Sequence, residues 1–407
     1  MPQVGQKMKS NYLDTLSKNL TGFLVGFLLL SCAIFREQMF FLHGLLIAYL
    51  YGLFIFFGVG LSAFFLSRLL KLKGRYGIIV VVFVEILLGV LLRTVIMSQV
   101  NMPIVGVFLK KLYFRNAIQF DPKLSQYDTR LGYLYRPNVS ASYNLWEFKS
   151  FISTNKAGLR DDSASLNNPN IITIGDSYTT GWGVEQQETY AQLIEKRLNK
   201  KVLNAGISSF GTIREGVLLS QLDKDSCEWV IVQYCGNDFL ENKTCADAML
   251  MGKPFIPKIN KANYQNSSIQ DGVQATYTPF RFIFELLKAF FFKLLRIERE
   301  QDSYKDTSTI PLQVTYFLKS LEVIQRSYKG KILIITLSSP RSDSTFVAQA
   351  EAQNTKLRLP NTYFLNAGKY FKSTDSFILD GHLNKSGHAK VSSEIVKFLI
   401  NFERNHQ

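Results

Sequence analysis

The chain is poor in the residue types that hold metals or build disulfide frameworks. Its 407 residues include only four cysteines and four histidines. Cysteines this sparse predict no disulfide framework, and only Cys227 and Cys245 remain as a pair that the fold could bring within bonding distance. The cysteines and histidines form no spaced cluster of the kind that binds zinc. We therefore expect neither a metal nor any other cofactor.

Acidic side chains are also scarce. The chain has 32 Asp and Glu against 47 Lys and Arg, a formal net charge of +15. The excess is uneven, because residues 1–115 carry a net charge of +9 and the remaining residues +6. Basic residues that flank apolar runs are typical of membrane topology signals. We therefore expect no nucleic-acid partner.

Charge is nearly missing from three runs, at residues 20–35, 39–67 and 77–100. A helix needs about 20 apolar residues to cross a bilayer, so the second and third runs predict transmembrane helices. The first, at 16 residues, leaves the number of spans at two or three. The third contains Glu85 and Arg93, which lie about two helical turns apart on different sides. We expect Glu85 to pack between spans and Arg93 to reach outward.

The basic flanks predict the topology. Arg68, Lys71, Lys73 and Arg75 gather between the second and third runs, and such a loop stays in the cytoplasm. Residues 1–19 are then a cytoplasmic N-terminus and residues 20–100 the membrane segment. Whatever follows lies outside the cytoplasmic membrane, in a periplasmic or extracellular position. Three basic residues just after the third run oppose this orientation: Lys110, Lys111 and Arg115.

Residues 170–407 alternate between short β-branched runs and amphipathic segments. This alternation predicts a parallel sheet wrapped by helices. The expected strands are 171–174, 202–205, 229–234, 331–336 and 362–365, and the expected helices lie near 187–199, 212–222, 311–328, 344–354 and 385–402. Residues 101–169 form a connector, and residues 241–310 interrupt the pattern as an insertion.

Three short clusters of polar residues and glycine stand out. Two follow expected strands, and the third precedes the last expected helix. They are Gly175-Asp176-Ser177, Gly236-Asn237-Asp238 and Asp380-Gly381-His382. A serine becomes a nucleophile when a base takes its proton and a third group orients that base. Ser177, His382 and Asp380 can fill these roles, because His43 lies in an apolar run, His406 is penultimate and His388 falls in the first turn of the last helix.

An oxyanion formed at Ser177 needs donors already aimed at it. The Ser177 backbone N–H is one candidate. Gly206 follows the strand at 202–205, and the Asn237 side-chain amide follows the strand at 229–234. Because open parallel sheets gather their sites at the carboxyl ends of the strands, we expect all three donors at one edge.

The stretches Gly175–Val184 and Asn204–Gly211 carry a resemblance to the SGNH (GDSL-type) hydrolase superfamily. The resemblance implies a flavodoxin-like sheet and cleavage or transfer of acyl esters. It implies Ser177 as nucleophile, Gly206 and Asn237 as oxyanion donors and His382 as base. The connector, with Asn155-Lys156-Ala157-Gly158-Leu159-Arg160, resembles the lead-in of a membrane-anchored bacterial branch, and we expect an edge hairpin, a cover of the site or a structural collar there.

The acid departs from the spacing common in that superfamily. Asp-x-x-His would put the carboxylate at position 379, which is Leu, whereas Asp380 stands two residues before His382. In an extended segment, residues i and i+2 point to the same side, so Asp380 could reach the ring. Asp375, or a backbone carbonyl in place of an acid, remains an alternative.

The second part of the insertion, residues 279–300, is Phe-rich and helical in pattern. Its charged stripe opposes a broad apolar face, which is typical of an interfacial helix. A helix packed on the sheet or a lid over the site is the alternative. The charged residues are Arg281, Glu285, Lys288 and Arg296.

These observations predict a membrane-anchored serine ester hydrolase that acts on acyl esters, O-acetyl esters first, at the outer side of the membrane. The expected partners are an acyl ester substrate such as an acylated glycan, and the lipid bilayer. One alternative is an O-acyltransferase that modifies an envelope or exported polysaccharide, working with a membrane O-acyltransferase. Another is a degenerate glycan-binding protein. The first half-reaction is common to hydrolase and transferase, so the sequence leaves both open.

Overall fold

The computed structural model places the chain in two compact units. The first contains Met1–Asn116 and Gln265–Ile297, and the second Ala117–Tyr264 and Glu298–Gln407. The structure describes residues 2–34, 45–98, 117–145, 147–257, 259–275, 280–294, 307–337, 340–357, 359–377 and 380–405. Several residues of the predictions above lie outside this description: His43, Lys110, Lys111, Arg115, Arg296, His406 and the side chains of Arg93 and Arg281.

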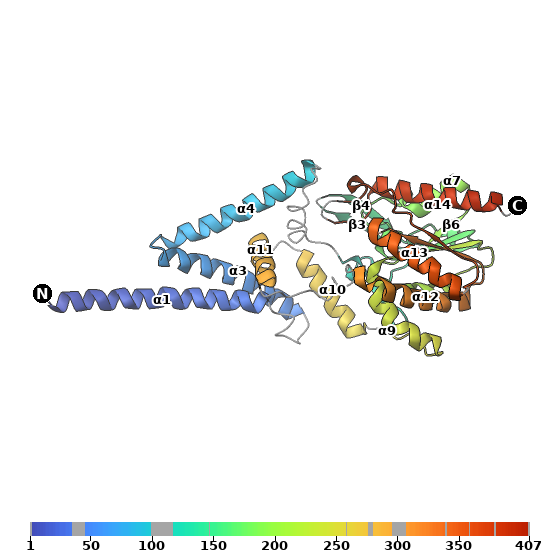
Figure 1. Ribbon diagram of the computed structural model, residues 1–407. Coiled ribbons are helices and arrows are strands. Elements are labelled where there is room, and N and C mark those ends of the chain that lie inside the picture. Colours follow the sequence, from blue (N-terminus) through green and yellow to red (C-terminus); the bar gives the residue numbers. More distant parts are fainter. Residues whose placement is uncertain are drawn as a thin grey trace. The chain divides into compact units, whose positions relative to one another are not determined.

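Three long helices build most of the first unit: α1 (Pro2–Ile34), α3 (Leu45–Leu69) and α4 (Gly74–Ser98) (Figure 1). Each contains a stretch long and apolar enough to cross a membrane, including α1, whose short apolar run left the number of spans open. The helices approach closely at small residues. A Cβ on Gly26 would lie 2.7 Å from the Ser62 backbone nitrogen, and such contacts are common where helices pack in lipid.

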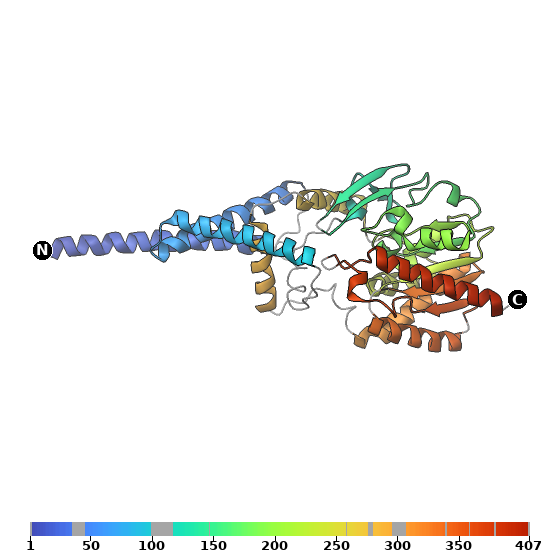
Figure 2. The same ribbon diagram turned by 90° about the horizontal axis from the view of Figure 1, so that it is seen from above.

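The insertion contributes α9 (Phe239–Leu250), α10 (Lys261–Ala275) and α11 (Arg281–Leu294). Of these, α11 and the part of α10 from Gln265 onward belong to the first unit, and α11 packs against α4 and α3. It runs across the long helices rather than along them (Figure 2). α11 therefore packs on the helices of its own unit, and its relation to a membrane stays a prediction.

The second unit is organised around one five-stranded parallel sheet. Its strands are β5 (Ile171–Ile174), β6 (Val202–Asn204), β7 (Trp229–Tyr234), β8 (Lys331–Thr336) and β9 (Thr362–Leu365). They lie in the order β6-β5-β7-β8-β9, so the first strand along the chain has the second on one side and the third on the other. This is the flavodoxin-like 2-1-3-4-5 order, and the predicted fold class is confirmed.

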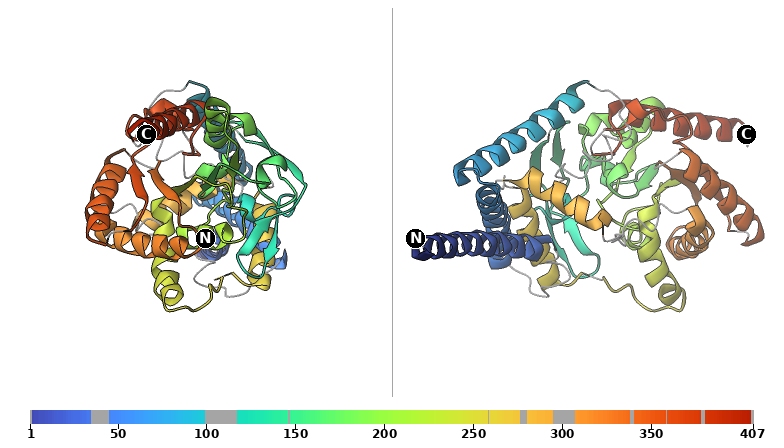
Figure 3. Two further views of the ribbon diagram at one scale, coloured as in Figure 1. Left: turned by 90° about the vertical axis from the view of Figure 1, so that its right-hand side faces the viewer. Right: turned by 60° about the vertical axis from the view of Figure 1, so that its left-hand side comes forward.

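Helices cover both faces of the sheet (Figure 3). Alternate residues of a strand point to opposite faces, so Val230 and Val232 of β7 enter one core and Trp229 and Ile231 the other. The first core is closed by α8 (Thr212–Leu219), α12 (Ile310–Ser327) and α13 (Pro340–Leu357). The second is closed by α7 (Tyr190–Leu198) and α14 (Lys385–Asn405).

The connector forms two antiparallel hairpins, β1 (Ser125–Asp128) with β2 (Gly132–Tyr135), and β3 (Ser140–Asn144) with β4 (Lys149–Ser153). Their inward side chains, including Tyr133, Tyr135 and Ile152, join the first core of the sheet. Residues 117–169 of the connector are therefore part of the second unit. All four cysteines are free, so the pairing of Cys227 with Cys245 does not form.

Candidate active site

Ser177 begins a single helical turn, α6 (Ser177–Thr180), directly after β5 and Gly175-Asp176. The turn is tight, because a Cβ on Gly175 would lie 2.0 Å from Oγ1 of Thr179. Asp176 caps it by accepting the Tyr178 backbone N–H at 2.9 Å. Glycine and aspartate thus bring the serine to the carboxyl end of a central strand, where the sequence placed it.

Ser177 meets His382 across 205 residues of chain. Its Oγ lies 2.7 Å from Nε2 of His382, and Nδ1 of the same ring bonds Oδ1 of Asp380. The ring also packs against Tyr178, with centroids 5.0 Å apart. The structure therefore brings together the hydroxyl, imidazole and carboxylate that the sequence singled out.

The segment around Asp380 reaches the ring by a turn and not by an extended backbone. Gly381 has a φ of +86°, and its N–H bonds the Phe377 carbonyl at 3.0 Å. The sequence allowed an extended segment with further adjustment at Gly381, and the structure uses the glycine, in a left-handed conformation. Asp375, the alternative acid, has other partners: Ser386 Oγ at 2.7 Å and Lys390 Nζ at 2.5 Å.

Asp380 is enclosed by two residues that the sequence did not point to. Its side chain is fully buried, and Oδ2 accepts the indole N–H of Trp182 at 3.2 Å. Its backbone N–H donates to Oε2 of Glu147 at 2.7 Å. A carboxylate that bonds on both oxygens is fixed in orientation, which in turn fixes the histidine ring.

Gly206 and Asn237, the proposed oxyanion donors, lie beside the α6 turn. The Asn237 amide donates to Oδ2 of Asp176 at 3.4 Å, which leaves its second hydrogen for another acceptor. The Gly206 N–H donates to Oδ1 of Asn204 at 3.1 Å, and the Asn204 amide donates to the Thr179 carbonyl at 3.0 Å. Glycine is needed at 206, because a Cβ there would lie 2.4 Å from the Thr180 nitrogen.

Three carboxyl groups are buried beneath this arrangement. Burial raises the pKa of Asp176, and burial together with the neighbouring carboxyls raises the pKa values of Glu215 and Asp238 well above their usual range. Asp238 also accepts the Thr212 hydroxyl at 3.0 Å. Within the described residues, no group of three or more His, Cys, Asp or Glu side chains is arranged to hold a metal ion.

His388, the remaining described histidine, stands in the first turn of α14 as expected. Its ring is buried and accepts the Tyr190 backbone N–H at Nδ1, 3.2 Å away. Burial lowers its pKa to about 3. It is therefore a neutral core histidine, and His382 is the one that faces Ser177.

Arg160 is a site residue whose role the sequence did not reveal. Its side chain is completely buried, and its guanidinium donates to backbone carbonyls at the end of α6, in the loop after it and in β4. The acceptors are the carbonyls of Thr180 at 3.0 Å, Gly181, Val184 at 2.6 Å and Phe151 at 2.9 Å. Burial lowers its pKa to about 10, and it stays charged at neutral pH. Arg160 thus holds the chain that leaves the nucleophile.

Asp161 connects the same motif to the strand that leads to Gly206. Its Oδ2 accepts the Asn204 N–H at 2.7 Å, and its Oδ1 accepts the Gln192 amide at 2.9 Å. Burial raises its pKa to about 7. Arg160 of the connector motif therefore contacts the nucleophile turn, and Asp161, the next residue, contacts the oxyanion strand. The motif's unexplained Asn-x-x-Gly-x-Arg pattern was the only signal that could have indicated this.

The sheet order defines an α/β protein with a flavodoxin-like fold, and a serine, a histidine and an aspartate meet at the carboxyl edge of its sheet. Neither a family model nor a curated protein matches the chain. Solved structures similar to it include a lipolytic protein of the G-D-S-L family from Desulfitobacterium hafniense DCB-2. That protein is 9% identical over 56% of this chain and 99% of its own, with a TM-score of 0.33.

Two carbohydrate esterases are similar to the same extent. The acetyl xylan esterase Est2A from Butyrivibrio proteoclasticus is 14% identical over 57% of this chain and 63% of its own, with a TM-score of 0.34. A family 2 carbohydrate esterase with a carbohydrate-binding domain, from Myceliophthora fergusii, is 15% identical over 56% of this chain and 64% of its own, with a TM-score of 0.32. This chain thus spans slightly less than two thirds of either esterase.

Proposed function

We propose that this chain is a membrane-anchored serine ester hydrolase that acts on acyl esters, with O-acetyl esters as the first candidates. The observation that carries the proposal is the 2.7 Å contact between Ser177 Oγ and His382 Nε2, with Asp380 on the other ring nitrogen. A base within hydrogen-bond reach of the nucleophile, oriented by a third group, is the arrangement that acyl transfer to serine requires.

In the first half-reaction, Ser177 Oγ attacks the acyl carbonyl carbon while Nε2 of His382 takes the hydroxyl proton. The carbonyl π electrons move to oxygen and give a tetrahedral oxyanion. When this intermediate collapses, the bond to the alcohol breaks and His382 returns its proton to the leaving oxygen. The product is an ester on Ser177 and a free alcohol.

The oxyanion is stabilised by N–H donors fixed before the reaction. Ser177 is the first residue of α6, so its backbone N–H has no acceptor within that helical turn. The second amide hydrogen of Asn237 points away from the bond to Asp176. Gly206 N–H, already bonded to Asn204, becomes a shared donor.

In the second half-reaction, water attacks the acyl carbon and His382 takes one of its protons. The acid leaves and the proton returns to Ser177. Asp380 stabilises the imidazolium in both half-reactions, since its carboxylate bonds Nδ1. The reaction consumes one water per ester and needs no cofactor.

The orientation proposed for the chain places the second unit outside the cytoplasmic membrane. The turn between α3 and α4 carries Lys71 and Lys73, with Arg68 and Arg75 at the adjoining helix ends. By the positive-inside rule this turn stays in the cytoplasm, and the chain leaves α4 on the opposite side.

The test is Ser177→Ala in the purified full-length protein in detergent, assayed with p-nitrophenyl acetate and labelled with a fluorophosphonate probe. Both signals should disappear while the melting temperature is retained. Ser220→Ala is the matched control, because that serine is exposed at the end of α8 and should keep both. Undiminished cleavage by Ser177→Ala would contradict the proposal.

The fate of the acyl group is measured in the same preparation. Incubation of the enzyme with an acyl donor and a polysaccharide acceptor, followed by mass spectrometry, should give free acid. Acylated polysaccharide in place of free acid would assign the second half-reaction to a sugar hydroxyl and overturn the hydrolase.

A further inference from the structure

Glu85 lies in the middle of a membrane-length helix and is only 5% exposed. A carboxylate in this position is costly unless donors satisfy it. Its two oxygens accept the backbone N–H groups of Phe282 and Ile283, at 3.1 and 3.0 Å. These are among the first N–H groups of α11, which have no acceptor within their own helix. Glu85 and the N-terminus of α11 therefore satisfy each other inside the apolar unit.

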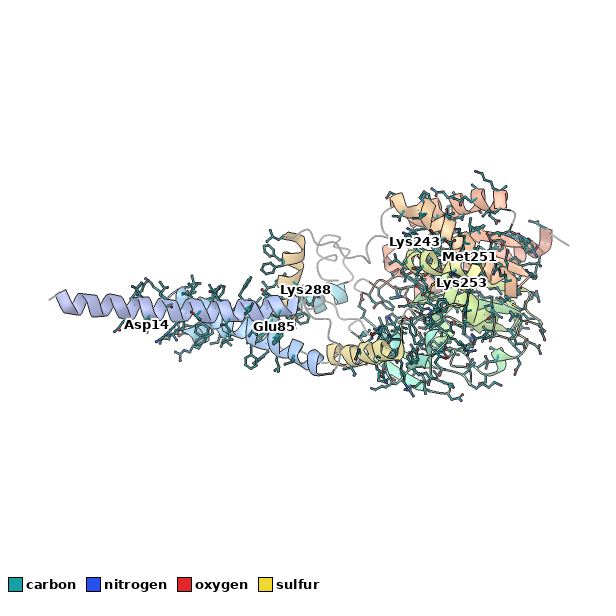
Figure 4. The ribbon with its side chains drawn as sticks, turned by 90° about the horizontal axis from the view of Figure 1, so that it is seen from below. Asp14, Glu85, Lys243, Met251, Lys253 and Lys288 are labelled. Carbon is teal, nitrogen blue, oxygen red and sulfur yellow. The ribbon has the colours of Figure 1, made fainter. Side chains whose placement is uncertain are left out.

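The apolar face of α11 is buried against the long helices. Phe284 is fully buried in a cluster with four of their side chains: Leu30, Ala33, Ile55 and Val59. The ring of Phe280 stacks on that of Phe56, with centroids 5.7 Å apart. Figure 4 labels Glu85 on α4 and Lys288 on α11 in this unit. The contacts span the length of α11, so it is docked and not merely adjacent.

Other apolar side chains of α11 remain exposed. Phe290 and Leu294 are 61% and 63% exposed, matching Phe83 of α4 at 64%. Phe83 lies on a helix with the composition of a membrane span, and α11 packs on that same helix. The exposed apolar side chains of both helices therefore suit the acyl-chain region of a bilayer.

The length of α11 decides how it enters the membrane. Its 14 residues rise about 21 Å, which is less than the roughly 30 Å of a bilayer core. The chain on both sides of Gln265–Ile297 belongs to the second unit, so this segment is an excursion between two parts of that unit. Glu85 lies near the middle of α4, so its bonds hold the N-terminus of α11 within the apolar part of the first unit.

We infer that α11 is a membrane-embedded, non-spanning helix that binds lipid acyl chains through Phe290 and Leu294 and is held in place by Glu85. The insertion is thus a second membrane attachment of the catalytic unit. This inference is independent of the proposed ester chemistry, because it concerns a different unit of the protein.

The test uses full-length protein in phosphatidylcholine vesicles, with tryptophan as the probe. Phe290→Trp is compared with Tyr370→Trp, whose position is exposed in the second unit, each relative to the parent protein. Lipids brominated on their acyl chains should remove most of the fluorescence added at position 290, and aqueous iodide should remove that added at position 370. Equal responses of the two variants would overturn the membrane placement.

The role of Glu85 is tested in the Phe290→Trp background. Glu85→Leu removes both acceptors, and quenching by brominated lipid at position 290 should fall while access to iodide rises. Glu85→Gln keeps one carbonyl oxygen and should retain most of the lipid quenching. Because leucine favours membrane insertion, Glu85→Leu should still insert. Unchanged quenching in Glu85→Leu would overturn the assignment of Glu85 as the residue that holds α11.

Discussion

Trp182 donates its indole N–H to Oδ2 of Asp380 at 3.2 Å, while Oδ1 of the same carboxylate bonds the His382 ring. The tryptophan stands five residues after the nucleophile, in the loop held by Arg160. The segment carrying the nucleophile therefore also orients the acid. The contacts therefore link the loop after α6 to Asp380, His382 and Ser177 in turn. A change in that loop should alter the positions of both Ser177 and His382.

Asp380→Asn should lower kcat by roughly 10³–10⁴-fold with little change in KM, the loss seen when a triad acid becomes an amide. The amide keeps the shape of the side chain but presents Nδ1 with the wrong hydrogen-bonding group. Steady-state kinetics of the purified full-length protein measure the effect. A loss under tenfold would mean that Ser177 and His382 act as a dyad.

Trp182→Phe should lower kcat about tenfold, because a hydrogen bond to a charged group contributes about 1.5–3 kcal/mol and only one of the carboxylate's bonds is lost. Phenylalanine retains aromatic packing against Tyr143 and Phe148, whose rings lie 5.0 and 5.3 Å away. The melting temperature reports whether that packing survives. An unchanged kcat would show that the indole does not orient Asp380.

Arg160→Lys should slow the reaction of Ser177 with a fluorophosphonate and lower kcat more than it changes KM. An ammonium has three donors and no planar fork, so it cannot hold the four carbonyls that the guanidinium holds. Labelling rates well below the melting temperature separate this positioning effect from a loss of stability. Arg130→Lys, at an exposed position, is the matched control. Equal labelling rates in both variants would restrict Arg160 to a structural role.

Asp161→Asn should change how stability depends on pH. The pKa of Asp161 is raised to about 7 in the folded protein, so the folded state holds a proton that the unfolded state has already released above about pH 4. Its contribution therefore falls as pH rises from about 4 to 7, with a limiting slope of about 1.4 kcal/mol per pH unit. The asparagine variant lacks this slope. Melting temperatures between pH 4 and 8 test it, and parallel curves for both proteins would refute it.

Much of the fold could be predicted because its signals are local. The β-branched runs at β5 and β7 and the amphipathic segments between strands fix a parallel sheet through residues close in sequence. Glycines at tight turns mark strand ends in the same way, which is why Ser177 and Asn237 were placed correctly at the carboxyl edge. Two of the three membrane-length helices were predicted from apolar length alone, and the first was left open.

Other features depend on contacts between distant segments. The sequence left the acid open between Asp380, Asp375 and a backbone carbonyl, because the left-handed Gly381 is invisible until the turn is formed. Arg160 looks like any basic residue until four carbonyls surround it. The backbone conformation of Gly381 and the carbonyls around Arg160 both depend on distant segments of the chain, so neither can be read from the residue itself.

By itself the sequence singled out Ser177 and His382 as candidates for the chemistry and identified the segments that suit a membrane, since both follow from residue type and short-range periodicity. Only the tertiary structure decided which carboxylate faces His382, what the connector motif holds, and that Glu85 meets the N-terminus of α11. Burial is the physical reason. A charged or polar group inside a protein is stable only beside its partners, and those partners are chosen by the folded chain and not by neighbours in sequence.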